Sequence, residues 1–156
     1  MEGLVHSINI SDGGVPKLPR TSVAVRKTGL QGDRQRDLEY HGGPNRAVSI
    51  YSLELIEKLR AEGHPIAVGT IGENLTLSGL DWAALGPGVR MEVGEVEIEL
   101  TADAPPCRNI APSFSDRVFT RVAQKAHPGW SRFYARVLKE GTLRVGDRVR
   151  VVASRD

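Results

Sequence analysis

Short runs of alternating apolar and polar residues, separated by glycine and proline, extend through most of the chain. Residues 4–10, 22–26 and 47–51 combine this period of two with β-branched side chains, the pattern of half-buried strands. Residues 89–93 and 96–100 alternate in the same way on either side of a Gly-Glu turn, which predicts a β-hairpin. The chain is therefore expected to consist mainly of strands joined by turns.

The last third of the chain repeats this pattern. Residues 133–138 and 143–152 flank a turn at Glu140 and Gly141, and they predict a second hairpin. Glycines flank the short β-branched runs of this region, as they do where barrel strands bend sharply.

Two segments have the period of an amphipathic helix. In residues 53–62, Leu55, Ile56 and Leu59 form one apolar stripe, with a serine placed to cap the start and a glycine placed to end it. The second predicted helix covers residues 113–126, where apolar residues recur every four positions.

The second predicted helix carries a basic stripe of Arg117, Arg121 and Lys125. This stripe either faces an anion or forms a solvated surface, and the pattern leaves both interpretations open. With these helices, the sequence predicts one α+β domain over residues 1–156, mainly β, with a mostly antiparallel sheet and about two helices.

The composition agrees with one globular domain. The 156 residues are 40% hydrophobic and 26% charged, as in average soluble domains. No apolar run approaches the roughly 18 residues that cross a bilayer, and the start of the chain lacks the pattern of a signal peptide. We therefore expect a cytoplasmic protein without a membrane partner. The net charge of +2 is too small to indicate nucleic acid as a partner.

The sequence lacks the signatures of several large enzyme classes. It contains no G-x-x-x-x-G-K-[ST], no G-x-G-x-x-G after a strand, no H-E-x-x-H and no C-x-x-C. These absences count against nucleotide hydrolysis, dinucleotide binding, zincin and thioredoxin chemistry. A single cysteine, Cys107, also excludes an internal disulfide.

Cys107 is the most informative candidate for chemistry. Two prolines precede it and hold the backbone extended, so the thiol is expected in a fixed loop after the strand at residues 96–101. Arg108 follows, and a neighbouring cation favours the thiolate, which is both a nucleophile and a soft metal ligand. The alternative, that Cys107 is a small buried apolar residue, stays open at this stage.

Two glycine-rich segments carry further candidate ligands. His41, Asn45 and Arg46 surround a Gly-Gly-Pro turn, where backbone amides and a cation can approach an oxyanion or a phosphate. Glu73 and Asn74 lie where another glycine turn enters a strand, and they would supply an acid or base and an amide clamp. Tight turns whose polar residues satisfy their own backbone explain both segments as well.

Taken together, five strings of the sequence resemble the MOSC family, the domain named after the C-terminal part of molybdenum cofactor sulfurases. The strings are GLQGD at 29–33, HGGPNRAV at 41–48, GENLT at 72–76, PC at 106–107 and YARVLKEGTLRVGD at 134–147. Their order and spacing cover most of the chain around one cysteine. The resemblance implies a β-rich, barrel-like MOSC fold.

The resemblance also implies a cysteine that either carries sulfur or ligates molybdenum in a pterin cofactor, the molybdenum cofactor (molybdopterin). The full sulfurases have an aminotransferase-like domain that this sequence lacks, so any pyridoxal phosphate chemistry is expected in another protein and no pyridoxal phosphate site is expected here. By resemblance, the catalytic and metal-ligand role falls to Cys107, and cofactor binding falls to His41, Arg46, Glu73, Asn74 and Arg108.

Three functions remain open on the sequence. A molybdenum-cofactor protein would use Cys107 as metal ligand and reduce N-hydroxylated or N-oxidised substrates with electrons from a partner reductase. A sulfur carrier would hold a Cys107 persulfide formed with a cysteine desulfurase. In a binding module, the barrel would present a phosphate or partner site, and Cys107 would only pack.

Overall fold

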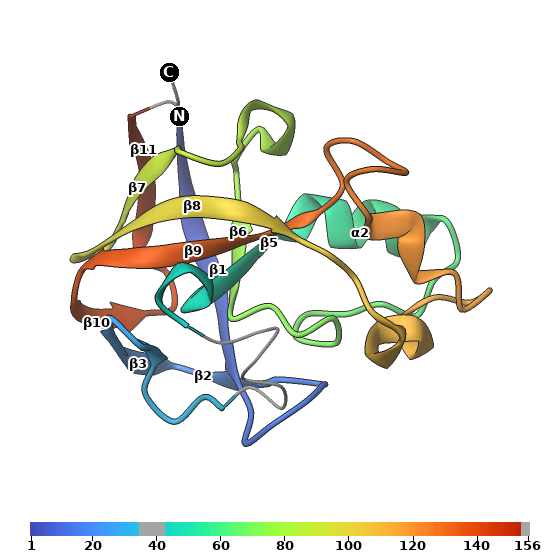
Figure 1. Cartoon of the computed structure of the whole chain (residues 1–156), viewed down its shortest axis with the longest axis horizontal. Helices are drawn as coiled ribbons and strands as arrows, with labels where there is room; N and C mark the ends of the chain where they lie inside the picture. The colour runs from blue at the N-terminus through green and yellow to red at the C-terminus, as the bar shows by residue number, and fades with distance from the viewer. Residues whose placement is uncertain (35–42, 154–156) are drawn as a thin grey trace.

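A barrel of seven strands forms the centre of the computed structural model, which describes residues 1–34 and 43–153 (Figure 1). Pairing of β11 with β1 closes the barrel, and only the β5–β6 pair among its neighbouring strands is parallel in the described part of the chain. The mainly β, mostly antiparallel and barrel-like architecture expected from the sequence is thus confirmed. Around the barrel the order is β1 (Glu2–Ile10), β11 (Arg148–Ala153), β7 (Arg90–Val93), β8 (Val96–Ala104), β9 (Arg132–Lys139), β5 (Val48–Ser52) and β6 (Leu75–Ser78).

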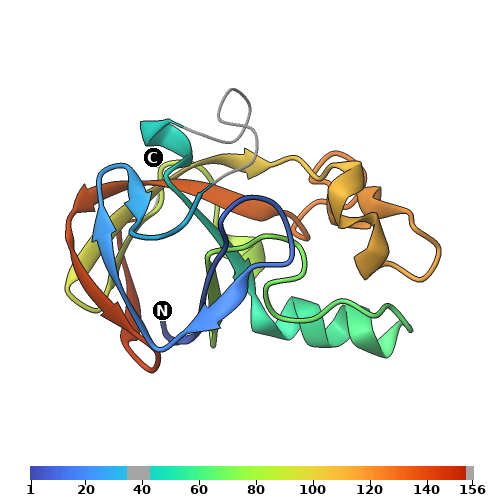
Figure 2. The ribbon, with the colours of Figure 1, turned by 90° about the horizontal axis from the view of Figure 1, so that it is seen from below.

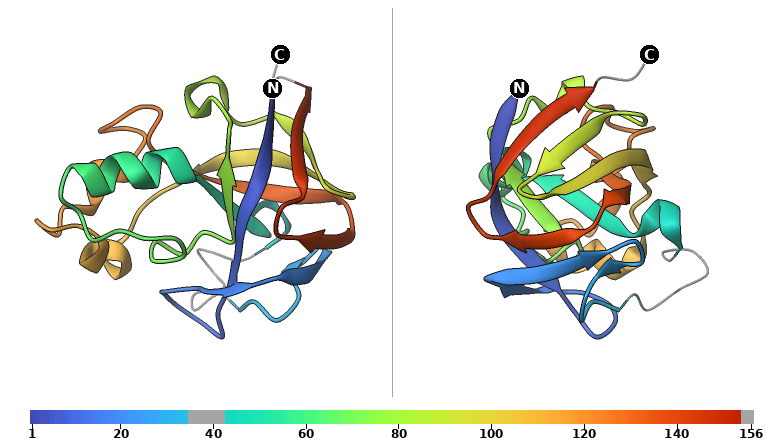
Figure 3. Two further views of the ribbon diagram at one scale, coloured as in Figure 1. Left: turned by 180° about the vertical axis from the view of Figure 1, so that it is seen from behind. Right: turned by 90° about the vertical axis from the view of Figure 1, so that its left-hand side faces the viewer.

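A smaller sheet lies below the barrel in the view of Figure 1 and also appears in both views of Figure 3. It contains β3 (Ser22–Arg26), β4 (Gly29–Leu30) and β10 (Gly141–Arg144). The short strand β2 (Leu18–Arg20) pairs with the end of β1 and leads into this sheet.

The barrel interior is filled by the apolar positions of the alternating pattern. Val5, Ile8, Ile50, Leu75 and Ile98 are each at most 1% exposed. Burial of one such side chain stabilises the fold by about 1.5–3 kcal/mol before entropy is counted, so the barrel is held mainly by this core.

Helix α2 (Leu53–Ala61) packs beside the barrel and forms where the sequence predicts it. The hydroxyl of Ser52 accepts a hydrogen bond of 3.1 Å from the amide N–H of Leu55, which caps the first turn. The predicted apolar stripe is buried, and Gly63 follows the helix with φ of +100°, a conformation that favours glycine.

The predicted α-helix over residues 113–126 is not found. The chain instead forms two short 3₁₀ segments, η3 (Arg108–Ser113) and η4 (Phe119–Val122). Between them, Arg117 has φ of +61°, which no α-helix tolerates, and Val118 is half exposed rather than part of an apolar stripe. The spacing of apolar residues was therefore misleading here.

The second predicted hairpin is also wrong. Strand β9 pairs with β8 and β5, whereas β10 turns away to pair with β3 in the smaller sheet. The predicted strand over residues 143–152 is divided into β10 and β11 by a turn, in which the amide of Gly146 and the carbonyl of Asp147 bond to the backbone of Val5. These long-range bonds explain why a local pattern could not predict the pairing.

The segment from β8 to β9 lies with α2 on one side of the barrel, as Figure 2 shows from below. Arg121 joins it to α2 by hydrogen bonds to Glu62 of 2.7 and 3.1 Å, and the Arg121 guanidinium stacks 4.0 Å from the ring centroid of Trp130. Tyr51 donates a hydrogen bond of 2.8 Å to the carbonyl of Trp130. These contacts anchor the segment that contains Cys107. None of the helices in the described residues is long and apolar enough to cross a membrane.

Two further 3₁₀ segments complete the described elements. These are η1 (Pro44–Arg46) before β5 and η2 (Trp82–Ala84) between β6 and β7.

Candidate functional site

A cleft of roughly 600 Å³, which includes the open space at its mouth, lies against one end of the barrel beside Cys107. It is formed by the β1–β2 loop, Arg34 after the short strand β4, Ser49 of β5, the segment before β6, the start of β9 and the loop that carries Cys107. Three described lining residues are cations and none is acidic. The cleft is lined by Gly14, Val15, Lys17, Arg34, Ser49, Ile71, Gly72, Cys107, Asn109, Ile110, Arg132 and Tyr134.

Cys107 lies at the wall of the cleft, between the end of β8 and η3. It is a free and partly buried thiol. The sequence predicted a loop position for this residue, and the structure places it there. Arg108, the neighbouring cation expected to favour the thiolate, is exposed and is not among the described lining residues.

Arg132 is a buried cation in the cleft that the sequence analysis did not single out. Its side chain donates to the carbonyls of Ile71 at 2.9 Å and Pro105 at 3.4 Å, and it therefore joins two walls of the cleft. The residue is 7% exposed, and its Nε has no hydrogen-bond partner among the described residues. A buried guanidinium without a carboxylate partner is costly, so the site favours an anionic ligand.

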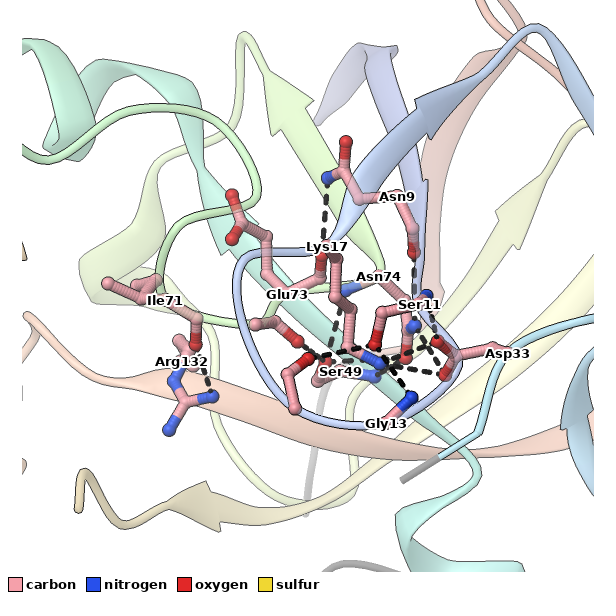
Figure 4. A network of polar contacts seen from close by, with 12 residues as sticks. Asn9, Ser11, Gly13, Lys17, Asp33, Ser49, Ile71, Glu73, Asn74 and Arg132 are labelled. Atoms are coloured by element: carbon pink, nitrogen blue, oxygen red, sulfur yellow. Dashed lines mark hydrogen bonds and ion pairs between the residues drawn. The ribbon is translucent and has the colours of Figure 1, made fainter. Parts of the chain in front are cut away.

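A second cation, Lys17, comes from the β1–β2 loop. Its ammonium group lies 2.7 and 2.8 Å from the two carboxylate oxygens of Asp33, and both side chains are less than 10% exposed. The same carboxylate accepts hydrogen bonds from the amide of Ser11 at 3.0 Å and from the Asn74 side chain at 3.0 Å (Figure 4). Asp33 thus ties three separate segments together behind the cleft.

Asn74 was predicted as an amide clamp for a ligand, but its hydrogen-bonding groups are taken up by the protein. Its Oδ1 accepts from the amide of Ser49 at 3.0 Å, while its Nδ2 donates to Asp33 and to the carbonyl of Asn9 at 3.2 Å. Asn74 is completely buried and does not line the cleft. The structure therefore places it one layer behind Ser49, a residue that does line the cleft.

Glu73 is likewise completely buried and does not line the cleft. One carboxyl oxygen accepts hydrogen bonds from the amide of Gly69 at 3.1 Å and the hydroxyl of Thr76 at 2.9 Å, whereas the other has no partner among the described residues. Complete burial raises the pKa of Glu73 above its ordinary value, against the lowering effect of these bonds. The structure therefore does not place the Glu73 carboxyl in the cleft, where an acid or base would meet a ligand.

Arg46 lies near the cleft through Tyr134. Its guanidinium carbon is 5.4 Å from the centroid of the Tyr134 ring, which lines the cleft. Burial raises the pKa of the Tyr134 hydroxyl, while the neighbouring Arg132 and Arg46 charges oppose this effect. Tyr134 is therefore neutral near pH 7.

The remaining candidates from the sequence are His41 and the basic stripe of Arg117, Arg121 and Lys125. His41 lies outside the described residues. The predicted basic stripe is not among the described lining residues of the cleft. Arg121 instead pairs with Glu62. The hydrogen bond from Arg121 is the main reason why the pKa of the Glu62 carboxyl is lowered. Sequence reasoning missed Lys17, because a lone lysine in a loop carries no motif.

Cys107, which the sequence analysis predicts as the metal ligand, lines the cleft. Within residues 1–34 and 43–153 there is no group of three or more His, Cys, Asp or Glu residues that could hold a metal ion. A metal beside Cys107 would need most of its ligands from a cofactor.

Comparison with known proteins gives a family match and several relatives. The family model for the MOSC domain matches residues 37–150. The uncharacterized protein YflK of Bacillus subtilis (strain 168) is 29% identical over 144 residues, which are 90% of this chain and 63% of YflK. The chain thus spans less than two thirds of the length of this curated relative.

Solved structures share the fold. The crystal structure of YiiM from Geobacillus stearothermophilus is 26% identical, with a TM-score of 0.73 over 97% of this chain and 75% of that one. YuaD from Bacillus subtilis is 17% identical, with a TM-score of 0.73 over 96% of this chain and 94% of that one. At this lower identity, YuaD supports the fold alone.

Proposed function

Because the chain belongs to the MOSC family of molybdenum-cofactor-related domains, we propose that its cleft binds the molybdenum cofactor with the Cys107 thiolate as a metal ligand. The single observation that carries this proposal is the position of the thiol. Cys107 lies partly buried at the wall of a cleft whose described charged residues are all cations.

The donor set of the cleft fits this group. Molybdenum in the cofactor is bound by a dithiolene, and a thiolate is the soft ligand that suits such a centre. The cofactor also carries a phosphate ester, which is close to dianionic at neutral pH. Arg132, with an orphaned Nε, and the exposed Arg34 are the cations that would compensate this charge.

When bound, the cofactor supplies two-electron redox chemistry at a metal. The residues of the chain hold and surround it. Arg132 fixes the Cys107 loop through Pro105, while Val15, Ile110 and the Tyr134 ring provide an apolar wall that limits water.

The reaction we propose is the reduction of an N-hydroxylated substrate. Conversion of R–NHOH to R–NH₂ consumes two electrons and two protons and releases one water. We propose that a partner reductase supplies the electrons. The protons come from solvent at the open mouth of the cleft.

A sulfur carrier is the second candidate, and the partial exposure of Cys107 favours it. The Cys107 thiolate would attack the outer sulfur of a desulfurase persulfide. The S–S bond of the donor breaks, the desulfurase leaves as a thiolate, and Cys107 becomes a persulfide without net oxidation.

Metal and pterin analysis distinguishes these functions. Wild type and Cys107→Ser are purified from a host that makes the cofactor, with Arg150→Met on the outside of the barrel as a matched control. We expect nearly stoichiometric molybdenum and pterin in wild type and the control, and loss of molybdenum in Cys107→Ser. No molybdenum in any of the three proteins would refute the cofactor proposal, and a dithiothreitol-labile sulfur on Cys107 would then identify a sulfur carrier.

A further inference from the structure

The ion pair of Lys17 with Asp33 is the most enclosed charged contact of the cleft. Lys17 lines the cleft, and its ammonium group lies within 2.8 Å of both oxygens of Asp33 (Figure 4). The exposed fractions of the two side chains are 8% and 5%. A pair buried to this degree is weakly screened by solvent and salt.

Asp33 is itself held in place from two sides. One carboxylate oxygen accepts from the amide of Ser11 at 3.0 Å, and the other accepts from the side chain of Asn74 at 3.0 Å. Asn74 is in turn fixed by Ser49 and Asn9. Because the carboxylate cannot move away without leaving buried donors unpaired, Lys17 remains neutralised.

The other two cations of the cleft have no such partner. No carboxylate of the described residues lies within 4.0 Å of the guanidinium groups of Arg132 or Arg34. Arg132 is buried and Arg34 is exposed. Of the three described cations of the cleft, two therefore lack an ion-pair partner among the described residues.

We propose that Asp33 is a specificity-determining residue: by neutralising Lys17 in the wall of the cleft, it matches the cleft to a dianionic ligand group such as a phosphate monoester. Asp33 does not contact the anion in this assignment. It acts through the charge of Lys17, while Arg132 and Arg34 supply the direct attraction. The inference rests on the proposed binding of an anionic cofactor in the same cleft.

Charge-changing variants test this assignment on the metal-free protein, with inorganic phosphate as the probe in calorimetric titrations at about 0.1 M ionic strength. Lys17→Met leaves the Asp33 charge uncompensated, and we expect phosphate to bind about fivefold more weakly, as for one unit charge near a partly solvated anion. Asp33→Asn releases the Lys17 charge, and binding should tighten by about the same factor. The double variant restores the charge of the cleft and should bind within about twofold of wild type.

The matched control is Arg150→Met. It removes one cation from an exposed ion pair with Glu92, so the overall charge changes by the same amount as in Lys17→Met. Because an exposed charge is screened beyond about 10 Å at 0.1 M salt, phosphate affinity should stay within about twofold of wild type. Circular dichroism and thermal unfolding of each variant confirm that the fold is retained.

The double variant decides the result even if Asp33→Asn alone does not fold. If the double variant binds phosphate as weakly as Lys17→Met, Lys17 contacts the anion directly and the proposal is overturned. Unchanged binding in Lys17→Met, or no phosphate binding by wild type, overturns it as well. The titrations need no molybdenum and leave Cys107 unaltered, so their outcome is independent of whether Cys107 ligates the metal.

Discussion

Replacement of Asn74 by alanine tests whether the layer behind the cleft is held by polar contacts. The side chain makes three hydrogen bonds of 3.0–3.2 Å: one from the amide of Ser49, one to the carbonyl of Asn9 and one to the Asp33 carboxylate. A fourth contact, of 3.3 Å from the Ser49 hydroxyl, is not counted because the single proton of that hydroxyl is also directed at the carbonyl of Gly72 at 3.1 Å. It is fully buried, so water does not replace these bonds in the variant. Each neutral bond contributes about 1 kcal/mol and the bond to a carboxylate about 2 kcal/mol.

The expected loss for Asn74→Ala is therefore about 4 kcal/mol of unfolding free energy. For a chain of 156 residues, this corresponds to a decrease of roughly 8–16 °C in Tm. The assay is urea and thermal unfolding monitored by far-UV circular dichroism. Asn45→Ala provides the control, because Asn45 is exposed in η1 and should lose less than about 0.5 kcal/mol.

A loss in Asn74→Ala as small as that in the control would refute this reasoning. It would mean that Ser49, Asn9 and Asp33 find other partners in the variant, and that the Asn74 contacts do not hold the layer behind the cleft.

Two further predictions concern the segment before β6. Burial raises the pKa of folded Glu73 above its ordinary value of 4.5, so the folded state binds the proton more tightly than the unfolded state. The free energy of unfolding therefore falls as pH rises above about 4.5, by at most about 1.4 kcal/mol per pH unit. Glu73→Gln should remove this dependence of the unfolding free energy on pH, measured by urea unfolding between pH 5 and 7. An equal dependence on pH in both proteins would contradict the prediction. Gly69→Ala places a Cβ against the carbonyl oxygen of Lys17 and should lower the free energy of unfolding by more than about 3 kcal/mol. The control is Gly63→Ala, which has open space around its Cβ and should lower it by about 1–2 kcal/mol. Equal losses in the two glycine variants would show that the close approach at Gly69 is unimportant.

Patterns within a few residues of sequence predicted the elements that are stabilised by contacts between residues close in sequence. The capped helix α2 and the β7–β8 hairpin formed as expected, because an N-cap bond, an apolar stripe and a two-residue turn act over a few residues. The pairing of β10 with β3 was missed, since it joins residues more than one hundred positions apart. Within the same sheet, β3 and β4 pair locally, with Arg26 opposite Gly29.

The predicted helix over residues 113–126 failed for a different reason. Its apolar residues do have helical spacing, but Phe114 is buried just after η3 and Val122 is buried in η4, while Val118 between them is half exposed. Arg121, assigned to a basic stripe, packs on Trp130 instead. Tertiary contacts thus decided the conformation of this segment against its local pattern.

The candidate site was predicted in part. Cys107 was identified from its prolines and its place in the MOSC pattern, and it lies in the cleft. Glu73 and Asn74 were predicted to bind the cofactor, but both are completely buried and do not line the cleft. Arg132 and Lys17 were missed as site residues because only the closed barrel brings their strands and loops beside Cys107.

The central claim is that Cys107 ligates molybdenum, and X-ray absorption at the molybdenum edge of the loaded protein tests it most directly. The dithiolene of the cofactor contributes a fixed number of sulfur ligands. We expect one additional sulfur ligand in wild type, absent from any molybdenum retained by Cys107→Ser. A sulfur count in wild type equal to that of the dithiolene alone would contradict it.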